Sequence, residues 1–122
     1  ASNSASIVLF STVAVQRGMP FHSSVSSSKG AIEGLAKSLA AELSPKIRVN
    51  VIAPSLVNTP LANRFLNNDI KIEKSANRHP LKRIGSASDI ANLTDYLISD
   101  KSSWITGQII AVDGGLSTIE TN

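Results

Sequence analysis

Apolar residues change their spacing along the chain in a way that predicts strands alternating with helices. Residues 7–10 form a short, wholly apolar run, typical of a strand buried on both faces of a parallel sheet. Across residues 24–43 apolar side chains recur every three or four positions, which predicts a helix that ends before Pro45. The β-branched segment 47–53 predicts a second strand, which Pro54 stops.

The rest of the chain repeats this order with weaker signals. Residues 11–20 contain Gly18 and Pro20 and are predicted to be a loop. Residues 58–83 are mixed and polar and are expected to hold short helices. Ser86 and Asp89 have the spacing of a capping box, which predicts a helix from there, and residues 108–112 form a third predicted strand.

The order strand, helix, strand, helix, strand indicates an α/β fold with a parallel sheet. Strands joined through helices of this length are parallel, because a hairpin needs only a short turn. Such crossovers are usually right-handed, so the face on which each helix lies can be predicted. With 122 residues, the chain is expected to form one domain at most.

Composition excludes several classes of protein. Cysteine is absent, which rules out disulfide scaffolds and thiolate metal sites and fits a cytoplasmic location. The net charge of +3 comes from scattered Lys and Arg, and aromatic residues make up only 4%, so no nucleic acid partner is expected. No apolar run approaches the roughly 20 residues that span a membrane.

His22 and His79 lack the spacing of a metal site, so no metal site is expected. Trp104 and Tyr96 are interpreted as packing residues. Asp113 is interpreted as a hydrogen-bond partner of the local backbone.

Several motifs in fixed order resemble the short-chain dehydrogenase/reductase family, in particular its 3-oxoacyl-acyl-carrier-protein reductase-like members. They include the strand-end pair Ser11-Thr12, the Ser28-Lys29-Gly30-Ala31 segment, and Val112-Asp113-Gly114-Gly115. Residues 47–60 and 79–91 follow the same family pattern. The resemblance covers nearly the whole chain and implies a Rossmann-like parallel sheet with flanking helices. Residues 1–122 would be the C-terminal half of that NAD(P)-binding domain, with three strands.

The resemblance also implies a reaction and the residues that perform it. Family members move hydride between NAD or NADP and an alcohol or carbonyl of a small-molecule substrate. A tyrosine exchanges the proton, a lysine one helical turn later lowers the tyrosine pKa and holds the nicotinamide ribose, and a strand-end serine binds the substrate oxygen. Carried onto this chain, the candidate catalytic residues are Thr12, Lys29 and Ser11. The candidate cofactor-binding residues are Lys29, Pro54, Ser55, Val57 and Thr59.

Several departures from the family pattern bear on function, and Thr12 in place of the family serine is the mildest, because its hydroxyl can still form a hydrogen bond. Val25 stands four residues before Lys29, where the family has tyrosine, and valine cannot transfer a proton. His22, three residues upstream, is either a replacement acid/base or a surface loop residue, and the second interpretation is favoured. Ser55 stands where the family usually has glycine.

The glycine-rich phosphate loop of the family does not occur in this sequence. The function is therefore expected to be that of an oxidoreductase fragment, with a pseudoenzyme or oligomer-forming fragment as the alternative. A half-sheet leaves a strand edge open, so the chain is expected to form a homo-oligomer, dimer or tetramer, or to meet a partner chain that supplies the N-terminal half. The small residues between Gly30 and Ala41 suit a helix interface.

Overall fold

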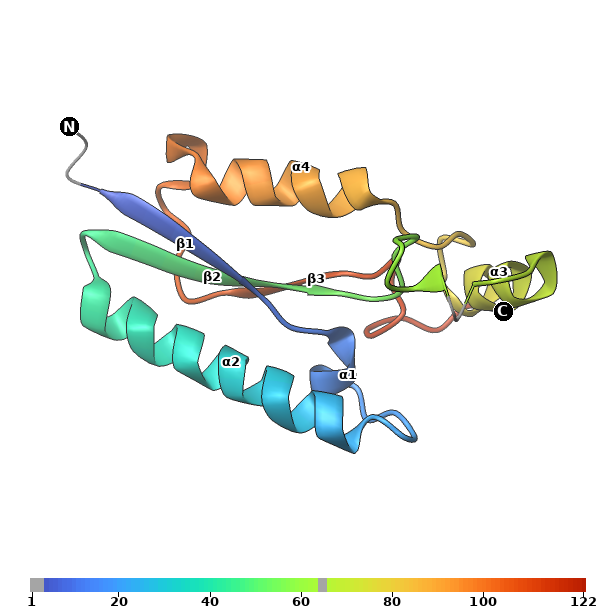
Figure 1. Ribbon diagram of the computed structural model, residues 1–122. Coiled ribbons are helices and arrows are strands. Elements are labelled where there is room, and N and C mark those ends of the chain that lie inside the picture. The colour runs from blue at the N-terminus through green and yellow to red at the C-terminus, as the bar shows by residue number, and fades with distance from the viewer. Residues whose placement is uncertain (1–3, 64–65) are drawn as a thin grey trace.

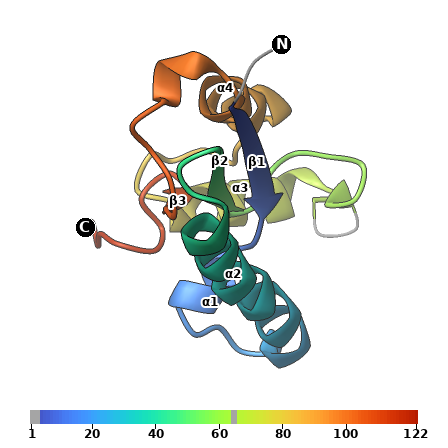
Figure 2. The same cartoon turned by 90° about the vertical axis from the view of Figure 1, so that its left-hand side faces the viewer.

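The computed structural model describes residues 4–63 and 66–122 and arranges them in three layers (Figure 1). The middle layer is a parallel sheet of β1 (Ala5–Phe10), β2 (Ile47–Pro54) and β3 (Ile109–Val112), in the spatial order β1-β2-β3. Helix α2 (Ser23–Leu43) covers one face and α4 (Ala87–Ile98) the other, as the end view shows (Figure 2). The predicted α/β fold with three parallel strands is confirmed.

Three short helices complete the described elements: α1 (Val13–Gln16), α3 (Asp69–Arg78) and the 3₁₀ helix η2 (Asp100–Ser102). Helix α1 lies within the segment predicted to be a loop. It forms because Thr12 adopts extended backbone angles and its hydroxyl oxygen accepts a hydrogen bond from the Ala14 amide at 3.3 Å, which caps the helix. Helix α3 confirms the expectation of short helices between residues 58 and 83.

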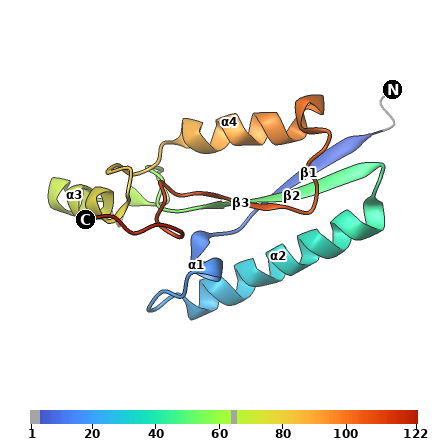
Figure 3. The ribbon, with the colours of Figure 1, turned by 180° about the vertical axis from the view of Figure 1, so that it is seen from behind.

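The two crossovers have opposite hands, which the sequence did not predict. With strands in the order β1-β2-β3, two right-handed crossovers would place both helices on one face. The structure instead has α2 and α4 on opposite faces, as the view from behind also shows (Figure 3). This arrangement covers both faces of the sheet, so the side chains of β2 are buried on either side.

The core on the α2 side is built from small and β-branched residues. Val49 and Val51 of β2 are fully buried and pack against Ala36 and Ala40 of α2. The alanines let the helix approach the sheet closely, and Leu39 and Leu43 close the cluster. Alternate residues of β2 point to the opposite face, which places Asn50 and Ile52 beneath α4.

The face beneath α4 is held by a polar network. The Asn50 side chain donates to the Ile105 carbonyl at 3.0 Å and accepts from the Gln108 amide at 3.1 Å, which ties β2 to the start of β3. The Arg48 guanidinium donates to the carbonyls of Leu97, Ser99, Ser102 and Ile105. These bonds fix the turn between α4 and β3, whose carbonyls would otherwise lack partners.

One of the two aromatic residues expected to pack does not do so. Trp104 is 99% exposed, so its interpretation as a packing residue is wrong for this chain, whereas Tyr96 is 42% exposed and is covered in part. Trp104 lies in the turn that precedes β3, and Tyr96 lies near the end of α4. Among the described residues, no helix is long and apolar enough to cross a membrane.

Candidate functional site

The carboxyl ends of the three parallel strands lie at one edge of the sheet, where ligands of open α/β folds bind. The register pairs Phe10 of β1 with Ile52 of β2, so Thr12 and Pro54 each follow this pair by two residues. In Figure 1 this edge faces α1 and α3. The sequence-predicted site residues therefore gather at neighbouring strand ends, in two groups.

The first group lies at the end of β1. The Lys29 ammonium, on the second turn of α2, donates to the Phe10 carbonyl at 3.2 Å. Thr12 is partly buried, and its hydroxyl oxygen accepts from the Ala14 amide, which leaves the hydroxyl proton free to donate to a ligand. A cation and a hydroxyl donor thus lie near one strand end.

Ser11 is placed differently from Thr12. Its side chain is 5% exposed, and its hydroxyl donates to the Glu33 carboxylate at 2.6 Å. Gln16 donates to the other oxygen of the same carboxylate at 3.0 Å. Glu33 is itself 5% exposed, so this buried group of hydrogen bonds ties the end of β1 and α1 to α2.

Glu33 is a residue that the sequence reasoning missed. The available signal was its spacing, because it follows Lys29 by four residues and therefore shares one face of α2 with it. An acidic side chain among the apolar positions that face the sheet is rarely buried without a partner.

The position that holds tyrosine in the family carries no proton donor in this chain. Val25 lies in the first turns of α2 and is 47% exposed. His22 precedes the helix, is exposed, and its Nδ1 lies 2.7 Å from the carbonyl oxygen of Pro20. That contact holds the imidazole to its own loop, in agreement with a surface histidine.

The second group lies at the end of β2. The amide of Ser55 donates to the Val112 carbonyl at 3.2 Å, which continues the pairing of β2 with β3 past Pro54. Val57 forms an isolated bridge with Gly85, and Thr59 accepts a bond from the Ala62 amide at 3.3 Å. The loop from Pro54 to Thr59 is therefore held on one side by β3 and on the other by the segment before α4.

His79 meets this second group, a contact that the sequence did not predict. It follows α3, is 4% exposed, and its Nε2 lies 2.8 Å from the Ser55 hydroxyl oxygen. Its Nδ1 lies 2.6 Å from the Ser75 carbonyl oxygen. No local pattern predicts this pair, because residues 24 positions apart are brought together by the fold.

Asp113 closes the same region from the end of β3. Its carboxylate accepts bonds from the Gly115 amide, the Ser117 amide and the Ser117 hydroxyl, which confirms its predicted role as a partner of local backbone. Burial opposes ionisation of Asp113, but these hydrogen bonds and the nearby His79 outweigh it and lower the pKa of the carboxyl. Gly114 has a φ of +60°, and its Cα approaches the His79 side chain closely enough that an added Cβ would lie 3.5 Å from it.

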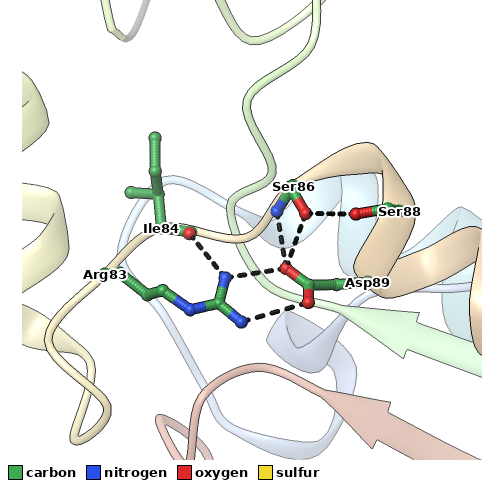
Figure 4. Close-up of polar contacts among 5 residues, drawn as sticks. All are labelled: Arg83, Ile84, Ser86, Ser88 and Asp89. Carbon is green, nitrogen blue, oxygen red and sulfur yellow. Dashed lines mark hydrogen bonds and ion pairs between the residues drawn. The ribbon is translucent and has the colours of Figure 1, made fainter.

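An ion pair fixes the start of α4 beside this region (Figure 4). The Arg83 guanidinium donates to both oxygens of the Asp89 carboxylate, at 2.7 and 3.0 Å. Asp89 also accepts from the Ser86 amide at 2.7 Å, so the predicted capping box is present. Hydrogen bonds from Arg83 and Ser86 hold the pKa of Asp89 far below its usual range.

A pocket of about 240 Å³ opens between the ends of β2 and β3 and the start of α4. Leu56, Leu81, Ile90 and Val112 give it apolar walls, while Ser55, His79, Asp113 and Arg83 bring polar groups to it. In the described ranges, no three His, Asp or Glu side chains gather where they could hold a metal ion.

Comparison with known proteins places this arrangement in a family. A family model described as enoyl-(acyl carrier protein) reductase matches residues 1–117. A tropinone reductase homolog from Datura stramonium is 44% identical over 119 residues, which cover 94% of this chain and 44% of that protein. The chain thus spans less than half the length of this curated relative.

Two solved structures have the same architecture. The ligand-free aldohexose dehydrogenase of Thermoplasma acidophilum is 34% identical, with a TM-score of 0.88 over 99% of this chain and 52% of its own. A 4-hydroxyisoleucine dehydrogenase solved with NADH is 31% identical, with a TM-score of 0.87 over 94% of this chain and 48% of its own. The predicted Rossmann-like fold is therefore confirmed, and the chain belongs to the short-chain dehydrogenase/reductase family.

Proposed function

We propose that the natural protein, at its full length, transfers hydride between NAD or NADP and an alcohol or carbonyl group of a small molecule. Residues 1–122 form the C-terminal half of its NAD(P)-binding domain and supply the nicotinamide end of the site. The observation that carries the proposal is the gathering of Lys29 and Thr12 at the end of β1, next to the loop that follows Pro54. The relative solved with NADH has the same fold over this part of its chain.

The residues at the strand ends fit a nicotinamide ribose and ring. Lys29 offers an ammonium for the ribose hydroxyls. In the structure this ammonium donates to the backbone carbonyl of Phe10 at 3.2 Å. The backbone at Pro54, Ser55 and Val57 lines the ring, and the Thr59 hydroxyl donates to the cofactor. The hydrogen bond to His79 holds the Ser55 side chain, and the bond from the Ser55 amide to the Val112 carbonyl holds its backbone to β3.

The substrate oxygen is assigned to Thr12 rather than Ser11. The Ser11 hydroxyl donates to Glu33 and is buried, whereas the Thr12 hydroxyl keeps a free proton. Ser11 then acts as a positioning residue that holds the strand end against α2. NAD(P), when bound, supplies or accepts the hydride; this chain's residues bind the cofactor and orient the substrate oxygen.

Val25 favours a second function, a member that binds NAD(P) without turning substrate over. Without tyrosine, the alcohol proton has no side-chain acceptor at the family position, and general acid–base catalysis contributes about 100- to 10,000-fold to rate. We therefore expect slow turnover in the wild-type protein. His22 does not replace the tyrosine in this proposal, since its imidazole contacts the carbonyl of Pro20.

The proposal extends to assembly and location. β1 lies at one edge of the sheet described here, and an uncovered parallel edge favours pairing with further strands. These strands come from an N-terminal half, either on the same chain or on a partner chain. Helix α2 packs against its copy in a dimer or tetramer. The protein is located in the cytoplasm. Sedimentation of the natural protein as a monomer at micromolar concentration would contradict the oligomer.

The test is hydride transfer by the purified natural protein. Absorbance of NADH and NADPH is followed with a panel of small ketones, aldehydes and alcohols. The expected result is slow turnover that depends on one of the two cofactors and falls further in Lys29→Met. Cofactor binding without any turnover would support the non-catalytic member, and absence of binding would overturn both functions. Lys37→Met, on the exposed side of the same helix, is the matched control.

A further inference from the structure

The contact between Ser55 and His79 is not part of the hydride-transfer chemistry, and its geometry resembles that of a serine beside a general base. The imidazole is 4% exposed, yet both ring nitrogens have partners, at 2.8 Å from the Ser55 hydroxyl oxygen and at 2.6 Å from the Ser75 carbonyl oxygen. A histidine bonded on both sides is fixed in orientation. A hydroxyl within hydrogen-bond reach of such a base is the arrangement that activates a serine nucleophile.

The partner on the far side of the ring decides which nitrogen carries the proton. A carbonyl oxygen can only accept a hydrogen bond, so Nδ1 of His79 must donate to Ser75. In the neutral imidazole Nε2 then has a free lone pair, and it accepts the hydrogen bond from the Ser55 hydroxyl. The carbonyl of Ser75 thus orients the base, as the third group of a catalytic triad does.

Charged side chains line the same pocket as His79. The Asp113 carboxylate lines the same pocket, and bonds from Gly115 and Ser117 keep it ionised. This anion stabilises the positive charge that develops on the ring while it removes the Ser55 proton. Arg83, paired with Asp89, brings a guanidinium to the pocket wall, where it favours negative charge on a reacting oxygen.

The nucleophile can be reached from the pocket. Ser55 is partly exposed and lines the cavity of about 240 Å³, whose apolar walls include Leu56, Leu81, Ile90 and Val112. This volume is below the usual range for ligand pockets, which indicates a short acyl group rather than a long chain. A hydroxyl nucleophile, an oriented imidazole and an apolar recess are three of the parts that acyl transfer uses.

We propose that Ser55 is a nucleophile for short-chain carboxylic esters, that His79 is its general base, and that the pocket bounded by β2, β3 and α4 takes the acyl group. The Ser55 oxygen forms a bond to the ester carbonyl carbon while His79 Nε2 removes its proton. The carbon–oxygen bond to the alcohol breaks, and the alcohol leaves with that proton. Water then adds to the acyl-serine by the same route and releases the carboxylic acid, so no oxidant or nucleotide is consumed.

The test uses the purified natural protein with para-nitrophenyl acetate and, separately, with a fluorophosphonate. We expect release of para-nitrophenol, a mass gain of one acetyl or phosphonyl group per chain, and peptide mapping that locates the group on Ser55. Because peptide mapping is done on the wild-type protein, this test does not depend on whether a variant folds.

Variants separate the chemistry from the structural role. Ser55→Ala should abolish labelling, and His79→Gln should slow it by about 100-fold or more. Ser75→Ala keeps the orienting carbonyl and should label like wild type. Circular dichroism and thermal melting establish that each variant is folded. A label on another serine, no label at all, or equal rates in wild type and a folded His79→Gln protein would overturn the proposal.

Discussion

The ends of β1 and β2 lie next to each other at one edge of the sheet, and they carry opposite departures from the family pattern. At β1, Lys29 and Thr12 are in place, but Val25 stands where the proton-transferring tyrosine belongs. At β2, Ser55 replaces the usual glycine and its hydroxyl lies 2.8 Å from His79. One region has lost an acid/base group and its neighbour has a serine–histidine pair.

This comparison shows that the fold and the chemistry are specified by different residues. The buried valines and alanines of the β2–α2 core and the network of Arg48 and Asn50 include neither Val25 nor Ser55. A strand end tolerates such changes because its side chains extend past the paired residues into loops. The sheet therefore keeps its form while the groups at its edge vary.

The largest expected effect is gain of turnover in Val25→Tyr. If the β1 site lacks only its proton carrier, the new phenol one turn before Lys29 should raise NAD(P)-dependent turnover by about 100- to 10,000-fold. Val25 is 47% exposed, so there is room for the larger ring. The measurement is steady-state turnover of the natural protein and of the variant.

Val25→Phe is the matched control for this gain. Phenylalanine adds the ring without the hydroxyl, so turnover should stay at the wild-type level. Equal rates in wild type, Val25→Tyr and Val25→Phe would contradict the account of the β1 site as lacking only its acid.

A second expected effect concerns the support beneath the β1 site. Glu33→Ala removes the carboxylate that accepts bonds from Ser11 and Gln16, and leaves a buried hydroxyl without its partner. The free energy of unfolding should fall by about 1–3 kcal/mol. Urea denaturation measures it, with the exposed Glu42→Ala on the same helix as control. A loss of unfolding free energy no greater than that of the control would show that the buried hydrogen bonds do not contribute to stability.

The third expected effect concerns the end of β3 beside the β2 site, where the stability of the fold should depend on pH through Asp113. Asp113 has a lowered pKa in the folded protein, so its ionised form stabilises the fold. This contribution is complete above the ordinary value of 3.8 and is lost as pH falls through the lowered folded pKa. Asp113→Asn should therefore lose less stability than wild type on acidification from about pH 5 to pH 1. Parallel stability curves for the two proteins would argue against this.

The smallest expected effect is at the exposed ion pair of α4. Arg83→Gln removes the contact with Asp89, and the melting temperature should fall by less than in Glu33→Ala. In high salt the difference from wild type should shrink, because exposed charges are screened. A melting temperature difference that persists unchanged in high salt would mean that the pair acts through packing.

Much of the fold could be predicted from sequence because its signals are local. The three strands, α2 and the α4 capping box follow from spacing, β-branched residues and the Ser86–Asp89 pair. Helix α1 was missed because a single threonine cap specifies its four residues. The hand of the second crossover was also missed, because it depends on how both faces of the sheet are covered.

The site was predictable only where family motifs identify residues one by one. Thr12 was expected after the first strand and Lys29 on the helix that follows, and the structure brings the Lys29 ammonium to the end of β1. Glu33 and His79 were not expected, because their partners are 22 and 24 residues away in sequence. The predicted packing of Trp104 failed because an apolar side chain at a turn has no local signal for what covers it.

The most direct test of the central claim, a nicotinamide site built on Lys29 and the loop after Pro54, is calorimetric titration of the natural protein with NADH and with NADPH. We predict saturable binding of at least one of them, weakened by about tenfold or more in Lys29→Met, because a charge-assisted hydrogen bond is lost. Failure of both cofactors to bind the folded wild-type protein, or binding unchanged in Lys29→Met, would contradict it.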